Sequence, residues 1–290
     1  MTTRLPDVGV AHLTLLGLTP PEVVTTAAAA GFDFVGLRVQ AVTPGEHQYP
    51  MAPGSPMSKE TLRRLDETGL SVRDVEFLSL GPETTATDWS PALEAGAALG
   101  ASTISVVGVD PDRSRLTDTL AALTADARAV GIVPTLEPIS YQPWSTVAAT
   151  APIARAAHAA LLLDATHLHR GGSSLSDVRA LEAELVPCLQ ICDGPRRLPE
   201  RFDVPDELPL GMKVDGSPLQ VEARVLRDVP GEGEFDLIEL LRSIPDGTPV
   251  SVEAPNAVLQ QSLSPLEFAK RNCAAVRGLL AAARETAHVR

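Results

Sequence analysis

Residues 132–167 read IVPTLEPISYQPWSTVAATAPIARAAHAALLLDATH, and this order of residue types recurs along the chain. The segment begins with one apolar run, Ile132 to Pro138, and ends with another, Ala160 to Asp164. Between them, Ser145 to Ala159 is rich in alanine, the residue that most favours helix. A strand, a helix and a second strand in this order form a βαβ unit, whose two strands lie parallel in one sheet.

Similar apolar runs, many of them rich in β-branched residues, occur throughout the chain, separated by Ala- and Leu-rich helical patterns. The eight runs are Val8 to Leu15, Phe34 to Val39, Val72 to Leu80, Thr103 to Val109, Ile132 to Pro138, Ala160 to Asp164, Cys188 to Asp193 and Val250 to Ala254. Most of them start about 25 to 40 residues apart, the spacing of a strand followed by a helix and two short loops. Gly31, Gly69, Gly100 and Gly131 each end a helical pattern just before a strand. A further helix is predicted from Ser176 to Leu185, before the seventh run.

This repeat predicts an α/β fold, a single-domain (β/α)8 TIM barrel over residues 1–290. An open doubly wound sheet is the alternative, but it gives no reason for the count to stop at eight. Two connections are longer than the usual short loop: residues 40–57 after the second strand and residues 194–233 after the seventh. Both follow a strand, so both belong to the face where barrels of this kind build active sites, and we expect lids or substrate walls there.

The loop 194–233 is rich in Pro, Asp, Glu and Arg, so we expect mostly irregular structure with one helical turn. We also predict that it folds over the barrel mouth and presents Arg227 to the substrate. A disordered loop, or one that contacts another copy of the chain, is the alternative.

The overall charge limits the partners of this chain. Its 37 acidic and 24 basic residues give a net charge of −13, which disfavours binding to nucleic acid or to an anionic membrane. No apolar run is long enough for a leader peptide or a membrane span, and Cys188, Cys192 and Cys273 form no CxxC pair, so we expect a cytoplasmic protein with reduced thiols. The GxGxxG, GxxxxGK[ST], HExxH and GxSxG motifs are absent, which removes the usual support for nucleotide binding and serine hydrolysis. A homo-oligomer stays open.

Oxygen-bearing side chains stand at the ends of four successive predicted strands. They are Glu137 after Leu136, Asp164 after Leu163, Gln190 in the seventh run and Glu253 in the eighth. A buried carboxylate is costly unless a cation balances it, so four converging groups predict one divalent metal site. The oxygen donors favour Mg²⁺ or Mn²⁺, with Co²⁺, Fe²⁺ or Zn²⁺ as alternatives. Taken singly, each residue has a competing interpretation as a solvated or helix-capping group.

Several short motifs together carry a resemblance to a known family. They are Gly31-Phe32-Asp33-Phe34-Val35-Gly36, Leu136-Glu137-Pro138, Leu163-Asp164-Ala165-Thr166-His167, Gln190-Ile191-Cys192-Asp193, Arg227-Asp228-Val229-Pro230-Gly231-Glu232-Gly233-Glu234 and Val252-Glu253. In this order, and over most of the chain, the sequence resembles the xylose isomerase-like TIM barrel superfamily, in particular its sugar phosphate isomerase/epimerase branch.

The resemblance implies that Glu137, Asp164, Gln190 and Glu253 bind one divalent metal. It further implies that His167 reaches substrate oxygens and that Arg227 binds a carboxylate, hydroxyl or phosphate of the substrate. The endonuclease branch of the superfamily uses several metals and extra histidines, and these are not evident here.

Three residues earlier in the chain are additional candidates. His12, near the end of the first predicted strand, could bind substrate at the barrel mouth, with a buried structural histidine as the alternative. Arg38 and Glu76 could also reach the pocket, with an internal salt bridge as the alternative.

The chemistry that fits these groups is proton abstraction next to a carbonyl. A divalent ion acidifies the C–H bond of an α-hydroxy ketone, because it stabilises the enediolate that forms. With Glu137 and Glu253 as catalytic proton acceptor and donor, we predict an isomerase or epimerase of a small polyhydroxy or keto substrate. A metal-dependent dehydratase of the inosose or 3-dehydroshikimate type, and a non-catalytic sugar-binding barrel, are the alternatives.

Overall fold

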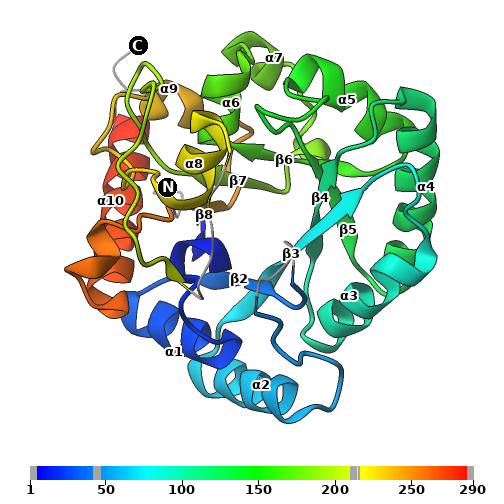
Figure 1. Ribbon diagram of the computed structural model, residues 1–290, viewed down its shortest axis with the longest axis horizontal. Coiled ribbons are helices and arrows are strands. Elements are labelled where there is room, and N and C mark those ends of the chain that lie inside the picture. Colours follow the sequence, from blue (N-terminus) through cyan, green and yellow to red (C-terminus); the bar gives the residue numbers. More distant parts are fainter. Residues whose placement is uncertain (1–4, 42–46, 210–213, 215, 286–290) are drawn as a thin grey trace.

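A closed barrel of parallel strands forms the centre of the computed structural model, which describes residues 5–41, 47–209, 214 and 216–285. The eight strands pair in sequence order, and β8 closes the barrel against β1 (Figure 1). The strands are β1 Val8–Val10, β2 Phe34–Arg38, β3 Ser71–Leu80, β4 Thr103–Gly108, β5 Val133–Glu137, β6 Ala160–Asp164, β7 Cys188–Ile191 and β8 Val250–Val252. This topology confirms the predicted single-domain (β/α)8 barrel.

Helices surround the strands and bury the outer face of the barrel (Figure 1). They are α1 Pro20–Ala30, α2 Pro56–Thr68, α3 Ala86–Ala98, α4 Arg113–Ala129, α5 Val147–Ala156, α6 Ala165–Gly171, α7 Leu175–Arg179, α8 Pro218–Val225, α9 Leu237–Leu241 and α10 Pro265–Glu285. Sequence signals set their limits, as α1 illustrates. Thr19 and Glu22 form a capping box at its start, and Gly31 ends it with a φ of 90°. That left-handed conformation explains why glycine stands there.

Three segments differ from the sequence-based prediction. The strand predicted from Val8 to Leu15 ends at Val10, and His12–Leu15 forms a 3-10 helix. Helix α6 was not predicted, and it begins directly after β6 because the Asp164 side chain accepts a hydrogen bond from the His167 backbone N–H. The predicted helix from Ser176 to Leu185 is instead α7 followed by a 3-10 turn, Ala183–Leu185.

The two long connections are partly described. Of residues 40–57, positions 42–46 lie outside the described residues, and the connection ends where α2 begins at Pro56. Residues 194–233 include α8, and at eight residues this helix is longer than the one helical turn expected there. Its cause is local: Ser217 and Gln220 form a capping box, and Pro218 occupies the first helical position.

A small group of apolar side chains packs inside the barrel, away from the carboxyl ends of the strands. Phe34, Leu162 and Cys188 form a small buried cluster of their own, separate from the large core between strands and helices. Gly9 makes room for it, because a Cβ there would lie 2.1 Å from the Phe34 ring. With this end filled, the open end lies at the carboxyl ends of the strands, where the polar residues gather.

Among the described residues, no helix combines the length and the apolar character needed to cross a bilayer.

Candidate active site

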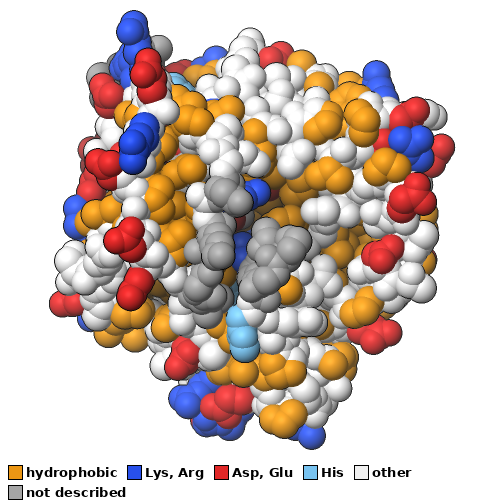
Figure 2. Space-filling view, in the orientation of Figure 1, with side chains coloured by type: hydrophobic (Ala, Val, Ile, Leu, Met, Phe, Trp, Pro, Cys, Tyr) orange, Lys and Arg blue, Asp and Glu red, His pale blue; other side chains and the backbone are white. Residues whose placement is uncertain are grey.

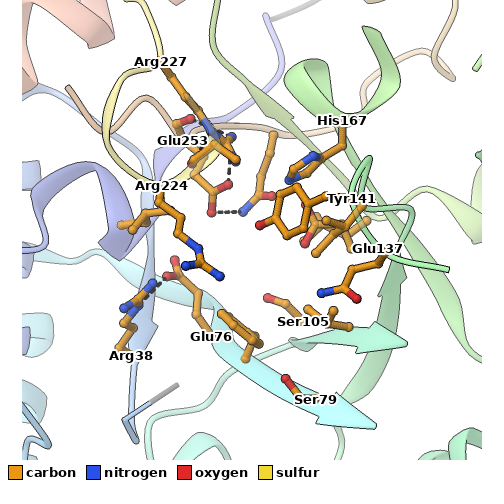
Figure 3. A pocket seen from close by; sticks show the side chains of 18 residues that line it. Arg38, Glu76, Ser79, Ser105, Glu137, Tyr141, His167, Arg224, Arg227 and Glu253 are labelled. Carbon is orange, nitrogen blue, oxygen red and sulfur yellow. Dashed lines mark hydrogen bonds and ion pairs between the residues drawn. The ribbon is translucent and has the colours of Figure 1, made fainter. Parts of the chain in front are cut away.

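A cavity of about 180 Å³ opens at the carboxyl ends of the strands. Figure 2 shows the face of the molecule hollowed near its centre, with basic side chains inside the hollow and most acidic side chains around the periphery. The polar lining of the cavity includes Arg38, Glu76, Ser79, Ser105, Glu137, Tyr141, Gln142, His167, Gln190, Arg224, Arg227 and Glu253 (Figure 3). An acidic protein thus places three arginines around this cavity.

Strand register brings the four predicted metal ligands to one region. Asp164 of β6 lies opposite Gln190 of β7, and Gln190 lies opposite Ser251 of β8. Glu253 follows Ser251 by two residues, so the alternation of side chains along an extended segment points both toward the same side. Glu137 completes the group as the last residue of β5.

The predicted ligands lie close to one another and to His167. The Gln190 amide donates a hydrogen bond of 2.8 Å to Glu253 Oε1. Glu137, Asp164 and His167 each offer one ligand atom, and these three atoms lie within 4.8 Å of one another.

Arg227 lies within this group. Its Nη1 is 2.6 Å from Asp164 Oδ2 and 2.9 Å from Glu253 Oε2, and it also donates to the Glu253 backbone carbonyl. The side chain is only 2% exposed, and its Nε donates to the Ala223 carbonyl at the end of α8. The guanidinium therefore lines the cavity and forms ion pairs with two of the predicted ligands, Asp164 and Glu253.

The charges of this cluster do not balance without a further cation. Glu137, Asp164 and Glu253, when ionised, carry three negative charges against one positive charge on Arg227, which leaves two negative charges. Among the described residues, no donor bonds Glu137 Oε1 or Gln190 Oε1, although both atoms are buried. A divalent cation would balance the charge and use both oxygens, so the residues present fit such an ion.

The pKa values point the same way. Burial, followed by the charges of Glu253 and Asp164, raises the pKa of the Glu137 carboxyl well above its ordinary value. Burial also raises the pKa of Glu253 to about 8, although Arg227 opposes the rise. The raised pKa values favour the protonated carboxyls when no cation is bound, whereas a bound cation would favour the ionised ones.

His167 is a neutral hydrogen-bond donor at the edge of the cluster. Burial lowers its pKa to about 4, so its contact of 3.8 Å with Glu137 Oε1 is not an ion pair at neutral pH. The Ser140 backbone N–H points at Nδ1, 3.4 Å away, which assigns the ring proton to Nε2. Nε2 faces the cavity, and Tyr141 packs edge-on against the ring.

His12 is placed differently from the other predicted residues. Its Nδ1 accepts a hydrogen bond from the Arg38 backbone N–H, and its Nε2 bonds to the Leu18 carbonyl. The ring is fully buried and does not line the cavity. Both nitrogens therefore hold backbone segments together, which is the structural alternative for this residue.

Arg38 and Glu76 form an internal salt bridge and also line the cavity, so both interpretations of these residues apply. Arg38 Nε is 3.5 Å from Glu76 Oε2, and both side chains are buried. Glu76 Oε1 also accepts a 2.7 Å hydrogen bond from the His12 backbone N–H. The carboxylate of Glu76 is thus already balanced by Arg38.

Tyr141 and Arg224 are functional candidates that the sequence analysis missed. Tyr141 follows β5 by four residues and belongs to an irregular loop, so no periodicity marks it. Arg224 lies in the last turn of α8, which ends at Val225, and Arg227 follows just beyond that end. Recognising α8 in the sequence would have revealed this signal.

Comparison with solved structures shows how widely the fold is shared. A fusion protein of a xylose isomerase-like TIM barrel and a 4-hydroxyphenylpyruvate dioxygenase matches 95% of this chain at 19% identity and a TM-score of 0.73, and the match spans 43% of that protein. The IOLI protein with a bound zinc atom matches 94% of this chain and 98% of its own, at 14% identity and a TM-score of 0.69.

A D-allulose 3-epimerase from Methylomonas sp., solved with D-allulose, matches 95% of this chain and 98% of its own, at 15% identity and a TM-score of 0.62. No curated protein matches the sequence. A family model described as xylose isomerase-like TIM barrel matches residues 24–277. That match covers most of the sequence, and the chain therefore belongs to the xylose isomerase-like TIM barrel family.

Proposed function

We propose that this protein is a divalent-metal-dependent isomerase or epimerase of a sugar-like or hydroxy-keto substrate. One observation carries the proposal: Glu137 and Glu253 face a single cavity, in a cluster with two negative charges in excess and two buried oxygens that lack a described partner. The structural likeness to a D-allulose 3-epimerase and to a zinc-bound protein of this fold supports it.

Glu137, Asp164, Gln190 and Glu253 would hold the metal. All four are at most 9% exposed, and all donate through oxygen, which favours Mg²⁺ or Mn²⁺. When bound, the ion polarises the substrate carbonyl and stabilises the negative charge of an enediolate.

Glu137 and Glu253 are the proposed proton acceptor and donor. They come from β5 and from the end of β8, and Figure 3 shows them on different sides of the cavity. Removal of a proton by one carboxylate and delivery by the other to the opposite face inverts one carbon, which is epimerisation. Delivery to the neighbouring carbon gives isomerisation.

His167 and Arg227 are the proposed substrate-binding residues. The Nε2–H of neutral His167 can donate a hydrogen bond to a substrate oxygen without adding charge. Arg227 holds Asp164 and Glu253 through Nη1, and its guanidinium also lines the cavity, where it can contact a substrate oxygen. We leave His12 out of this set because both of its ring nitrogens are bonded to backbone atoms.

A dehydratase is the second candidate. The sequence resemblance implies glutamine at the position of Gln190 in the hydroxypyruvate isomerase branch and in some dehydratase branches, where many other members have histidine, so this residue fits both reactions. Loss of a β-hydroxyl from the same enediolate would give the elimination product.

Turnover in D₂O tests the proposal. Ketoses, inososes and dehydroshikimate are incubated with protein and Mg²⁺ or Mn²⁺, and NMR follows the carbon next to the carbonyl. Deuterium incorporation without loss of water is expected for at least one substrate. An enone absorbance that grows with turnover would favour the dehydratase, and unchanged turnover in EDTA, once metal has been shown to be absent, would contradict both.

A further inference from the structure

The three arginines around the cavity differ in how their charges are balanced. Arg38 pairs with Glu76, and Arg227 pairs with Asp164 and Glu253. Arg224 also lines the cavity, yet no carboxylate among the described residues forms an ion pair with it. Its described partner is the phenol of Tyr141, which is neutral at neutral pH.

Arg224 and Tyr141 approach the cavity from different parts of the chain. Arg224 belongs to α8, and Tyr141 to the loop after β5. Figure 3 shows both side chains extending into the cavity from opposite sides. The Tyr141 phenol has a side-chain hydrogen bond with Arg224, and the charge of this guanidinium opposes the rise in the Tyr141 pKa that burial causes. Both groups can donate hydrogen bonds, so together they can bind one negatively charged acceptor group.

Helix α8 is fixed so that Arg224 keeps this direction. Glu222 is fully buried and forms a 2.6 Å ion pair with Arg170 of α6. Ala223 and Arg224 of α8 line the cavity, and so does Arg227, which follows the helix. The Glu222 ion pair and the hydrogen bond from Arg227 Nε to the Ala223 carbonyl hold α8 with Arg224 toward the cavity.

We propose that Arg224 and Tyr141 form a carboxylate-binding subsite, so that the substrate is a polyhydroxy or keto acid and not a neutral sugar. This inference rests on the proposed function for the reacting end of the substrate. The guanidinium fork matches the two oxygens of a planar carboxylate. The cavity is also smaller than the roughly 300 Å³ at which drug-sized pockets begin, which favours a carboxylate over a bulkier phosphate ester.

A matched ligand pair tests the subsite without turnover. D-Gluconate and D-glucitol differ only in a carboxylate against a hydroxymethyl group, and D-glucitol 6-phosphate supplies the phosphate comparison. Calorimetric titration of the parent protein should show gluconate binding at least about tenfold tighter than glucitol, because a charge-assisted hydrogen bond contributes that much or more. Equal affinities, no gluconate binding, or a preference for the phosphate would each overturn the proposal.

Two variants locate the effect. Arg224→Gln should bring the gluconate and glucitol affinities to within about twofold. Arg113→Gln removes the same charge from an exposed residue outside the cavity lining and should keep the parent preference. Persistence of the preference in Arg224→Gln would assign the anion to another residue.

These titrations measure binding alone. Failure of the D₂O experiment leaves their result intact, and failure of the titrations leaves the proton chemistry intact.

Discussion

Two sides of the cavity are built in different ways. The carboxylate side consists of Glu137, Asp164, Gln190 and Glu253, which stand at the ends of neighbouring strands and carry an excess of negative charge. The arginine side consists of Arg38 and Arg224, which come from β2 and from the helix α8 inside a long connection. Strand register fixes the first side, whereas one helix and its buried ion pair fix much of the second. In our proposal, the carboxylate side is the reacting end and the arginine side is the recognition end.

The largest expected effect concerns the carboxylate side. Glu253→Gln keeps the shape of the side chain and an acceptor for the Gln190 amide, but removes a proton acceptor and one negative charge. The kcat of the metal-loaded protein should fall roughly 10²- to 10⁴-fold. Glu94→Gln, an exposed residue of α3, is the matched control and should behave as the parent. Parent-like kcat in Glu253→Gln would remove this carboxylate from the chemistry.

The next prediction tests what holds the arginine side. Glu222→Gln leaves the buried Arg170 guanidinium without its charge partner, so the free energy of unfolding should fall by about 3 to 5 kcal/mol. Glu239→Gln breaks an exposed pair with Arg179 and should cost no more than about 1 kcal/mol. Urea unfolding measures both. Equal losses in the two variants would show that the Glu222 pair does not fix α8.

A pH series distinguishes the two sides by their charge. The pKa of Glu253 rises from 4.5 in the unfolded chain to about 8 in the metal-free fold, where burial is the main cause. The stability from this proton is therefore complete below about pH 4.5 and is lost as the pH rises through about 8. Urea unfolding in EDTA should show this loss in the parent and a smaller one in Glu253→Gln.

Adding Mg²⁺ sharpens the pH series. A bound cation balances the ionised Glu253 carboxylate in place of the proton. With Mg²⁺ present, the parent should therefore no longer lose stability relative to Glu253→Gln as the pH rises toward 8. A parent that gains stability relative to Glu253→Gln as the pH rises in EDTA would contradict the raised pKa.

The smallest effect is expected at Tyr141. Tyr141→Phe keeps the ring that packs against His167 but removes the phenol hydroxyl. The loss of one neutral hydrogen bond, about 0.5 to 1.5 kcal/mol, should weaken gluconate binding about two- to tenfold and leave glucitol binding nearly unchanged. Equal weakening for both ligands would show that Tyr141 acts by packing alone.

The sequence predicts the barrel and the carboxylate side well, because both depend on regular patterns. Apolar runs mark the strands, and the carboxylates and the glutamine come at or next to their ends, so parallel pairing brings them together. The arginine side was only partly predictable. Arg38 was a candidate from the sequence and lines the cavity, but Arg224 required the recognition of α8, an eight-residue helix inside a polar, Pro-rich connection. The sequence left two interpretations of His12, as a substrate-binding or a structural residue. The structure favours the structural one, because both ring nitrogens bond to backbone atoms.

Metal binding by the strand-end residues is the central claim, and counting bound ions tests it most directly. After equilibrium dialysis against Mn²⁺, atomic emission should find one ion per chain in the parent. Asp164→Asn should lose it, because asparagine can still cap α6 but brings no charge. Asp112→Asn makes the same change at the exposed N-cap of α4 and should retain one ion. No bound ion in the parent, or one ion in Asp164→Asn with unchanged affinity, would contradict the account.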